Sequence, residues 1–182
     1  MATGKNRLFF ALRPEAAPAA EARRLAERLR RAHGLAARPV ASERLHISLN
    51  FLAALSRPDP QVIDRAKAAV ADVRTPAFVV ALDRVGTWGR GVGARPVVIH
   101  ADDGVTGVRR LHAAIHAALA GAGLVRRLEP EIEPHLTLLR DTVAVPLEFI
   151  APVSWRVGEF VLLNSPRNEG RHEVLGRWPL IG

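Results

Sequence analysis

The sequence predicts an α+β fold in which two pseudo-symmetric lobes of mainly antiparallel sheet, with outer helices, surround a central cleft. Two observations lead to this prediction. Strand-like segments alternate with amphipathic helical segments along the whole chain. The chain also resembles itself when it is shifted by 89 residues. No low-complexity linker separates the elements, so we expect residues 1–182 to form a single domain built from an internal duplication.

The first half begins with a predicted strand over 7–13, RLFFALR, which is followed by a helix over 15–33. Small and aliphatic residues at helical spacing predict this helix, and Arg and Glu lie outside their stripe: Ala22, Leu25, Ala26, Leu29 and Ala32. Gly34 is a typical helix stop. Apolar and polar residues then alternate over 44–50, which predicts a strand over 44–52, and a second amphipathic helix is expected over 59–73.

The second half begins with two predicted strands, over 77–88 and 94–101, joined by the Gly-rich turn GRGVG. A third helix is expected over 104–121 and a further strand over 134–141. The chain ends in a predicted hairpin that turns at SPRNEG. Its strands are expected over 155–164 and 171–178.

The internal repeat covers a strand, a helix and a second strand, and it needs no gap. Under the shift, Gly34-Leu35 aligns with Gly123-Leu124, and His46-Ile47-Ser48-Leu49 aligns with His135-Leu136-Thr137-Leu138. Each half therefore carries the pattern His-x-Ser/Thr-Leu, and the two patterns lie on strands that the shift aligns with each other. Because alternate side chains of a strand share a face, each His lies beside its hydroxyl. Two equivalent strands that meet across a cleft bring two imidazoles and two hydroxyls together.

Such a constellation suits phosphoryl chemistry without a metal. One neutral imidazole removes a proton from the attacking oxygen, while one protonated imidazole supplies a proton to the leaving oxygen. Hydroxyls and arginines bind the non-bridging oxygens as charge develops on them. We therefore expect no cofactor and no metal ion. The absence of Cys also excludes thiolate chemistry and disulfides.

Five segments in order resemble the two-histidine (2H) phosphoesterase superfamily, whose signature is two His-x-Thr/Ser motifs in a duplicated fold. These segments are RLFFAL (7–12), LHISLNFL (45–52), FVVALDRVGTW (78–88), EPHLTLLRD (133–141) and LGRWPL (175–180). The similarity is greatest to the RNA 2′,3′-cyclic phosphodiesterases of bacteria and archaea, formerly named 2′-5′ RNA ligases. The sequence departs from the family pattern in three places: Ser48 replaces the commoner Thr, Ala53 replaces a Gly, and His172 stands where Tyr is expected.

The resemblance implies a phosphoric diester hydrolase that opens RNA 2′,3′-cyclic phosphate ends to 2′-phosphomonoesters. Reversible 2′-5′ RNA ligation is possible by the same chemistry. Carried over from the family, His46 is the proton donor and His135 the proton acceptor, and Ser48 and Thr137 bind the phosphate. Two alternatives stay open at this point, a non-catalytic module that binds RNA or nucleotide and a 2′-5′ oligonucleotide phosphodiesterase.

Arg140 and Phe51 are candidates for phosphate binding and nucleobase stacking. Strict alternation places Arg140 on the face opposite His135, so contact with phosphate requires a bulge or twist near the strand end. Strict alternation likewise places Phe51 on the face opposite His46, and core packing is its alternative role.

His112 and His116 have the i, i+4 spacing of some zinc ligands, but they lack the Glu of H-E-x-x-H and a nearby third ligand. We interpret them as structural, and His100 likewise. Trp88 is expected either in the core or at the cleft rim.

The net charge of the chain indicates its binding partners, and the length of its apolar runs indicates its location in the cell. The chain has 26 basic and 18 acidic residues, a net charge of +8, which favours anionic partners such as RNA. The segment MATGKNRLFFALRPE lacks the apolar core of a signal peptide, and no apolar run reaches the length of a membrane helix. The sequence therefore predicts a cytoplasmic protein with no membrane partner, and we expect a monomer.

Overall fold

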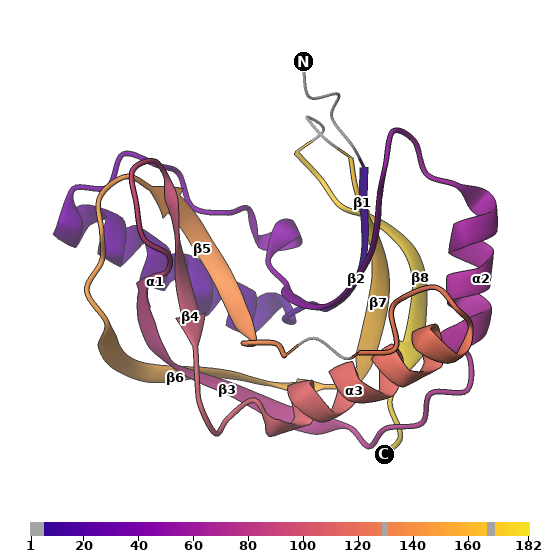
Figure 1. Cartoon of the computed structure of the whole chain (residues 1–182). Coiled ribbons are helices and arrows are strands. Elements are labelled where there is room, and N and C mark those ends of the chain that lie inside the picture. The colour runs from indigo at the N-terminus through magenta and orange to yellow at the C-terminus, as the bar shows by residue number, and fades with distance from the viewer. Residues whose placement is uncertain (1–5, 129–130, 167–169) are drawn as a thin grey trace.

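The computed structural model describes residues 6–128, 131–166 and 170–182. These residues form one eight-stranded sheet and three α-helices (Figure 1). The strands are β1 Asn6–Leu12, β2 Ile47–Leu55, β3 Phe78–Thr87, β4 Arg95–His100, β5 His135–Asp141, β6 Glu148–Val157, β7 Glu159–Ser165 and β8 Glu173–Pro179. The helices are α1 Ala16–His33, α2 Pro60–Val70 and α3 Thr106–Gly121, and a short 3₁₀ turn, η1 Ser42–Arg44, precedes β2. Every pairing between these strands is antiparallel.

The strand order has an internal symmetry. The sheet runs β6-β3-β4-β5-β2-β1-β7-β8, so β5 and β2 meet at its centre. The shift by 89 residues relates β1 to β4 and β2 to β5, and these pairs lie at equal distances from the centre of the sheet. The similarity of FVVAL (78–82) to FVLLN (160–164) relates β3 to β7 in the same way. This order agrees with the predicted duplication, which itself stays a prediction.

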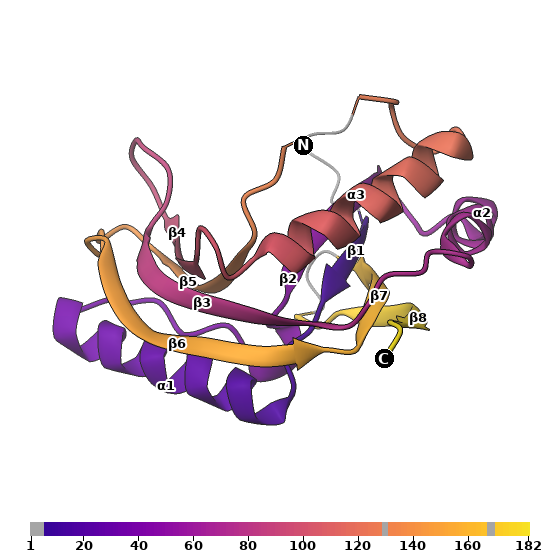
Figure 2. The ribbon, with the colours of Figure 1, turned by 90° about the horizontal axis from the view of Figure 1, so that it is seen from below.

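The two halves of the sheet touch only narrowly. Strands β2 and β5 pair at a single position, Ile47 with Leu136. Away from this point the halves diverge, as Figures 1 and 2 show. Helix α1 packs against β5 and β6, whereas α3 packs against α2, β2 and β3. Helix α1 therefore covers strands of the other half, and α3 packs against β2 of the other half as well as β3 of its own, which ties the two halves together.

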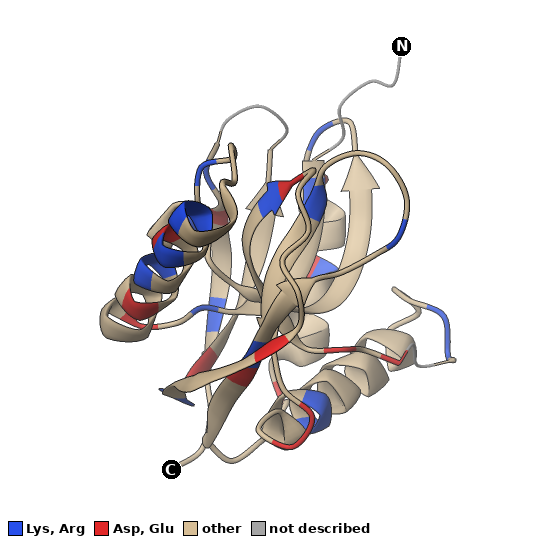
Figure 3. Cartoon of the chain, turned by 90° about the vertical axis from the view of Figure 1, so that its left-hand side faces the viewer, with Lys and Arg blue, Asp and Glu red and all other residues tan. Residues whose placement is uncertain are grey.

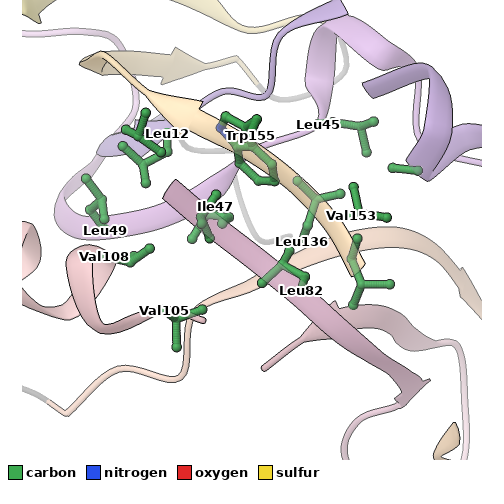
Figure 4. Packing of buried hydrophobic residues seen from close by; sticks show 14 of the residues in the cluster. Leu12, Leu45, Ile47, Leu49, Leu82, Val105, Val108, Leu136, Val153 and Trp155 are labelled. Atoms are coloured by element: carbon green, nitrogen blue, oxygen red, sulfur yellow. The ribbon is translucent and has the colours of Figure 1, made fainter. Parts of the chain in front are cut away.

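The core lies between the sheet and these helices. Leu12, Ile47, Leu82 and Leu136 are completely buried, and Figure 4 shows them packed together with the Trp155 ring. Ile47 and Leu136 also form the central pairing between the two halves. Burial of a large aliphatic side chain contributes about 1.5–3 kcal/mol. The residue that follows each motif histidine is thus anchored in the core, which fixes the backbone at the histidine.

The predicted helix stop Gly34 and its counterpart in the repeat, Gly123, adopt the same conformation. Gly34 and Gly123 have positive φ angles of 63° and 67°, a region that favours glycine. The amide of Leu35 donates to the Arg30 carbonyl, and the amide of Leu124 donates to the Leu119 carbonyl.

The main error of the sequence prediction lies near the C-terminus. We predicted one strand over 155–164, but the structure has two, β6 and β7, on opposite sides of the sheet. Gly158 separates them. The N-terminal part of β6 was missed because residues 148, 149, 151 and 152 are exposed and give no period-two apolar pattern. The hairpin of β7 and β8 is present as predicted, and its turn includes 167–169, which lie outside the described residues.

None of the helices formed by the described residues is long and apolar enough to cross a membrane.

Candidate active site

The two motif histidines are held by the same hydrogen bond. His46 lies immediately before β2, and its Nδ1 is 2.7 Å from the carbonyl oxygen of Arg44. His135 begins β5, and its Nδ1 is 2.8 Å from the carbonyl oxygen of Glu133. A carbonyl only accepts, so Nδ1 carries the proton in both rings. The nitrogen left to exchange a proton is therefore Nε2 in each case.

One cavity of about 450 Å³ collects the predicted residues at the junction of the two sheet halves. Its lining includes all six of the residues that the sequence singled out: His46, Ser48, Phe51, His135, Thr137 and Arg140. The remaining lining residues are Arg7, Phe9, Val40, Arg44, Ser165 and His172. The two motifs, 89 residues apart in the chain, thus face a common space as the repeat predicts.

A bulge in β5 places Arg140 in this cavity. In the β4–β5 pairing, Val97 lies opposite Leu139 whereas the next residue, Val98, lies opposite Thr137. One residue of β5 is therefore extra, and the alternation of its side chains shifts by one. Leu138 and Leu139 are both buried, and Arg140 emerges on the same face as Thr137.

The same irregularity occurs in β2. Phe9 lies opposite Phe51 and Ala11 opposite Ser48, so three steps of β2 match two steps of β1. Leu49 and Asn50 are consecutively buried, and Phe51 emerges into the cavity with 53% of its surface exposed. Phe51 and Arg140 are equivalent in the repeat. The cavity, and not the core, is therefore the location of Phe51.

Aromatic rings surround each motif histidine. The His46 ring lies 5.1 Å from Phe9 and 4.8 Å from His172, measured between ring centroids. The His135 ring lies 4.7 Å from Trp88, which in turn lies 5.0 Å from His100. Trp88 is thus at the rim of the cleft, one of the two positions expected for it. The departure at His172 from the family pattern lies directly beside His46.

The surroundings lower the pKa of His46 and of its neighbour His172. Burial is the main cause for His46, the hydrogen bond to the Arg44 carbonyl opposes it, and positive charge adds to the lowering from His135, Arg44 and Arg13. The pKa of His172 is lowered to about 4, chiefly by burial and then by charge on His46. His172 is therefore neutral at physiological pH, and it acts as an aromatic wall.

Sequence reasoning missed two arginines of the cavity, Arg7 and Arg44. The Arg7 guanidinium lies 5.7 Å from the centre of the Phe51 ring, a cation–π contact at the cavity mouth. Alternation gives a usable signal for Arg44, since it precedes His46 by two residues. No comparable signal identifies Arg7, because its contact with Phe51 depends on the pairing of β1 and β2.

The histidines considered as metal ligands lie elsewhere. His112 and His116 are buried on α3, and His112 Nδ1 lies 3.2 Å from the Leu49 carbonyl. The Asn50 side chain donates to the His112 carbonyl at 3.4 Å. These contacts join α3 to β2, which supports a structural role. Among the described residues, no group of three His, Asp or Glu side chains is placed to hold a metal ion.

Comparison with known proteins identifies the family. Residues 14–169 match the sequence profile of the 2′-5′ RNA ligase superfamily. This chain belongs to that superfamily. It is 32% identical over 151 residues to the RNA 2′,3′-cyclic phosphodiesterase of Escherichia coli, a match that covers 80% of this chain and 81% of the relative.

Solved structures of the superfamily support the assignment. A crystal structure of E. coli LigT complexed with 3′-AMP is 30% identical, with a TM-score of 0.74, and the match covers 98% of this chain and 99% of LigT. A Thermus thermophilus protein superposes with a TM-score of 0.76 over 97% of this chain and 98% of its own. At 22% identity that likeness shows the fold alone. The α+β fold and the membership of the 2H phosphoesterases that the sequence predicted are confirmed.

Proposed function

We propose that this chain is an RNA 2′,3′-cyclic phosphodiesterase that produces 2′-phosphomonoesters by paired-histidine catalysis, without a metal ion. The observation that carries the proposal is the matched pair His46 and His135. Both rings donate Nδ1–H to a backbone carbonyl and face one cavity that also holds hydroxyls and arginines. The homology to the E. coli enzyme supports the same reaction.

The reaction requires one group that accepts a proton and one that donates a proton. Water attacks phosphorus and gives up a proton to Nε2 of His135. The bond from phosphorus to the 3′-oxygen breaks, and this oxygen takes a proton from Nε2 of His46. Attacking and leaving oxygens lie roughly in line in such displacements, so the two proton transfers need groups on opposite sides of phosphorus. The assignment of donor and acceptor rests on the family resemblance, because the two hydrogen bonds are the same.

The lowered pKa of His46 fits a proton donor once the substrate is bound. Burial and neighbouring positive charge disfavour the imidazolium in the empty cavity. The anionic cyclic phosphate brings negative charge next to the ring, which favours the imidazolium and raises its pKa. His46 is therefore protonated when the substrate binds, and it is less protonated when the cavity is empty.

Phosphate and base have separate positions in the proposed complex. Ser48, Thr137 and Arg140 bind the non-bridging oxygens from the cavity walls. Phe51, with Arg7 over its ring, offers a stacking surface for the terminal base at the cavity mouth. RNA is the expected partner, and the cytoplasm, where RNA ends arise, is the expected location.

The test uses RNA that ends in a 2′,3′-cyclic phosphate, incubated with the protein in EDTA. The expected product is a 2′-phosphomonoester, identified because a general phosphomonoesterase removes its phosphate whereas a phosphatase specific for 3′-phosphates does not; the unreacted cyclic phosphate resists both. RNA with a 3′-phosphate end serves as a matched control and should stay unchanged. Binding without turnover would support the non-catalytic module instead, and activity that needs added divalent ion would overturn the paired-histidine mechanism.

A further inference from the structure

A second cavity, of about 210 Å³, adjoins the His135 side of the cleft. Trp88 connects the two spaces, since its ring contacts His135 and also lines the second cavity. Glu133 connects them as well, because its carbonyl holds His135 while the residue lines the second cavity. Ligand pockets for whole small molecules are typically about 300–1,000 Å³. This space is suited to one part of a ligand whose reacting end lies at His135.

The lining of the second cavity is aromatic and of mixed charge. Trp88 offers a ring surface, which suits stacking of a base. Arg109 is oriented by a hydrogen bond of 2.9 Å to the Asp102 carbonyl. Asp102 and Glu133 add two carboxylates, of which Asp102 is paired with Arg84 at 2.6 Å. Two carboxylates disfavour a phosphate, whereas they accept hydrogen bonds from the hydroxyl and amino groups of a nucleoside.

The direction of the reaction places the attacking group on this side. The terminal base stacks at Phe51 and Arg7, on β2 and β1, and the leaving 3′-oxygen faces His46. An in-line nucleophile must then approach from the side of the proton acceptor, His135. Trp88 and the second cavity border that approach. Water needs no binding surface there, but a larger alcohol does.

We propose that the second cavity is an acceptor subsite, which binds the nucleoside end of an RNA that carries a free 5′-hydroxyl. The inference rests on the proposed function and on His135 as the proton acceptor. The 5′-oxygen forms a bond with phosphorus, and its proton passes to His135. The bond to the 3′-oxygen breaks, and that oxygen takes a proton from His46. The product is a 2′-5′ phosphodiester with a free 3′-hydroxyl, and no other reactant is consumed.

The experiment measures how a cyclic mononucleotide partitions between water and a nucleoside. A 2′,3′-cyclic nucleotide is incubated with increasing adenosine, and 2′-monophosphate and 2′-5′ dinucleotide are quantified. In the wild type the rate of dinucleotide formation should saturate with adenosine, and the rate of hydrolysis should fall with the same half-saturating concentration, because the bound acceptor takes the place of the attacking water. 5′-Deoxyadenosine, which binds but has no 5′-hydroxyl, should reduce dinucleotide formation.

Arg109→Ala and Arg110→Ala form a matched pair of variants. Both residues are exposed on α3, but only Arg109 lines the second cavity. Arg109→Ala should raise the half-saturating adenosine concentration about three- to tenfold, the effect of one lost hydrogen bond. Arg110→Ala should match the wild type. Without adenosine, hydrolysis should be the same in all three proteins.

Three results would overturn the inference. One is a rate of dinucleotide formation that rises linearly up to the solubility limit of adenosine while the rate of hydrolysis stays constant, which indicates capture from solution. The second is an equal response of the two Arg variants. The third is a wild type that hydrolyses the cyclic nucleotide but forms no dinucleotide. Each of these leaves the proposed function intact, whereas absence of hydrolysis contradicts the proposed function and the subsite together.

Discussion

Identical hydrogen bonds hold His46 and His135, but the rings around the two imidazoles differ. Phe9 and His172 contact His46, and Trp88 contacts His135. The backbone carbonyls at 44 and 133 select the tautomer in both cases. What distinguishes the two proton roles is therefore the environment of each ring and the position of the substrate, and not the hydrogen bond. Substitutions at single residues can separate these roles.

The proton roles predict which variant a better leaving group rescues. His46→Ala and His135→Ala should each slow hydrolysis by about 10²–10⁴-fold, the usual contribution of a positioned acid or base. A substrate with sulfur at the 3′ bridging position has a leaving group that needs little protonation. His46→Ala should recover much of its rate on this substrate, as measured by single-turnover kinetics.

His135→Ala is the matched control, since its water still lacks a base on the sulfur substrate. Rescue of His135→Ala in place of His46→Ala would reverse the two roles and leave the reaction class unchanged.

The lowered pKa of His46 predicts a pH profile that moves on substrate binding. A proton donor must be charged, so activity is lost as the pH rises through its pKa. The limb due to His46 in kcat/KM, which reports the free enzyme, should lie below 6.5, the ordinary pKa of a histidine side chain. The corresponding limb in kcat should lie at higher pH, because the bound anion favours the imidazolium.

The assignment of this limb can be checked with the sulfur substrate. There His46→Ala should show no such limb, and an unchanged limb would assign it to another group.

His172 predicts a dependence of stability on pH. Its pKa is about 4 in the folded protein and near 6.5 in the unfolded chain, so the unfolded chain binds the extra proton. Stability contributed by the neutral ring is present above pH 6.5 and is lost as the pH falls towards 4. For this half-buried ring we expect a loss of roughly 1–2 kcal/mol after solvent screening.

His172→Phe should remove this loss, as measured by urea unfolding at pH 7 and pH 4.5. Equal losses in the two proteins between these pH values would contradict the prediction.

At the scale of strands, the bulges of β2 and β5 decide what the cleft contains. Each bulge buries two consecutive residues, Leu49 and Asn50 in β2 and Leu138 and Leu139 in β5. The next residue then emerges into the cavity, as Phe51 in one half and Arg140 in the other. The two halves thus provide different groups from equivalent positions, one for a base and one for a phosphate.

This division predicts that Phe51→Leu discriminates between two substrates and that Arg140→Ala does not. Phe51→Leu should raise KM for a nucleoside 2′,3′-cyclic phosphate about five- to a hundredfold, the range of one lost stacking contact. It should leave KM for the abasic ribose cyclic phosphate unchanged. Arg140→Ala should impair both substrates by a similar factor, because both carry the phosphate.

Equal effects of Phe51→Leu on the nucleoside and the abasic substrate would show that the ring does not stack on the base.

The motifs were predictable from sequence, but their geometry was only partly so. Alternation places Ser48 beside His46, and the repeat adds His135 and Thr137. Local periodicity fails at Arg140 and Phe51, because a bulge is set by the pairing of a strand with its neighbour. The same limit explains the missed part of β6, an exposed strand recognisable only through its pairing with β3. The pairing of strands distant in the sequence decides these features, so the local pattern of apolar and polar residues does not predict them.

At the scale of the whole molecule, positive charge extends beyond the cleft. Figure 3 shows basic residues spread over several elements, with a concentration along α1. Four arginines of α1 are exposed: Arg23, Arg24, Arg28 and Arg31. The cleft itself holds Arg7, Arg44 and Arg140. A mononucleotide in the cleft reaches only the second group, whereas a longer RNA can also reach charges on the outer surface.

The charge distribution therefore predicts a salt dependence that grows with RNA length. Each phosphate that a basic side chain neutralises releases condensed counterions, so log Kd changes with log salt with a slope of about 0.7 per contact for single strands. Binding of a 20-nucleotide RNA should weaken more steeply with KCl than binding of a cyclic mononucleotide, measured by titration with the His46→Ala, His135→Ala double variant to prevent turnover. The same RNA with a 3′-hydroxyl end should show nearly the same slope, because most of its contacts are remote from the terminal phosphate. Equal slopes for the long RNA and the mononucleotide would mean that only the cleft arginines bind, and that the net charge of +8 serves no role in holding RNA.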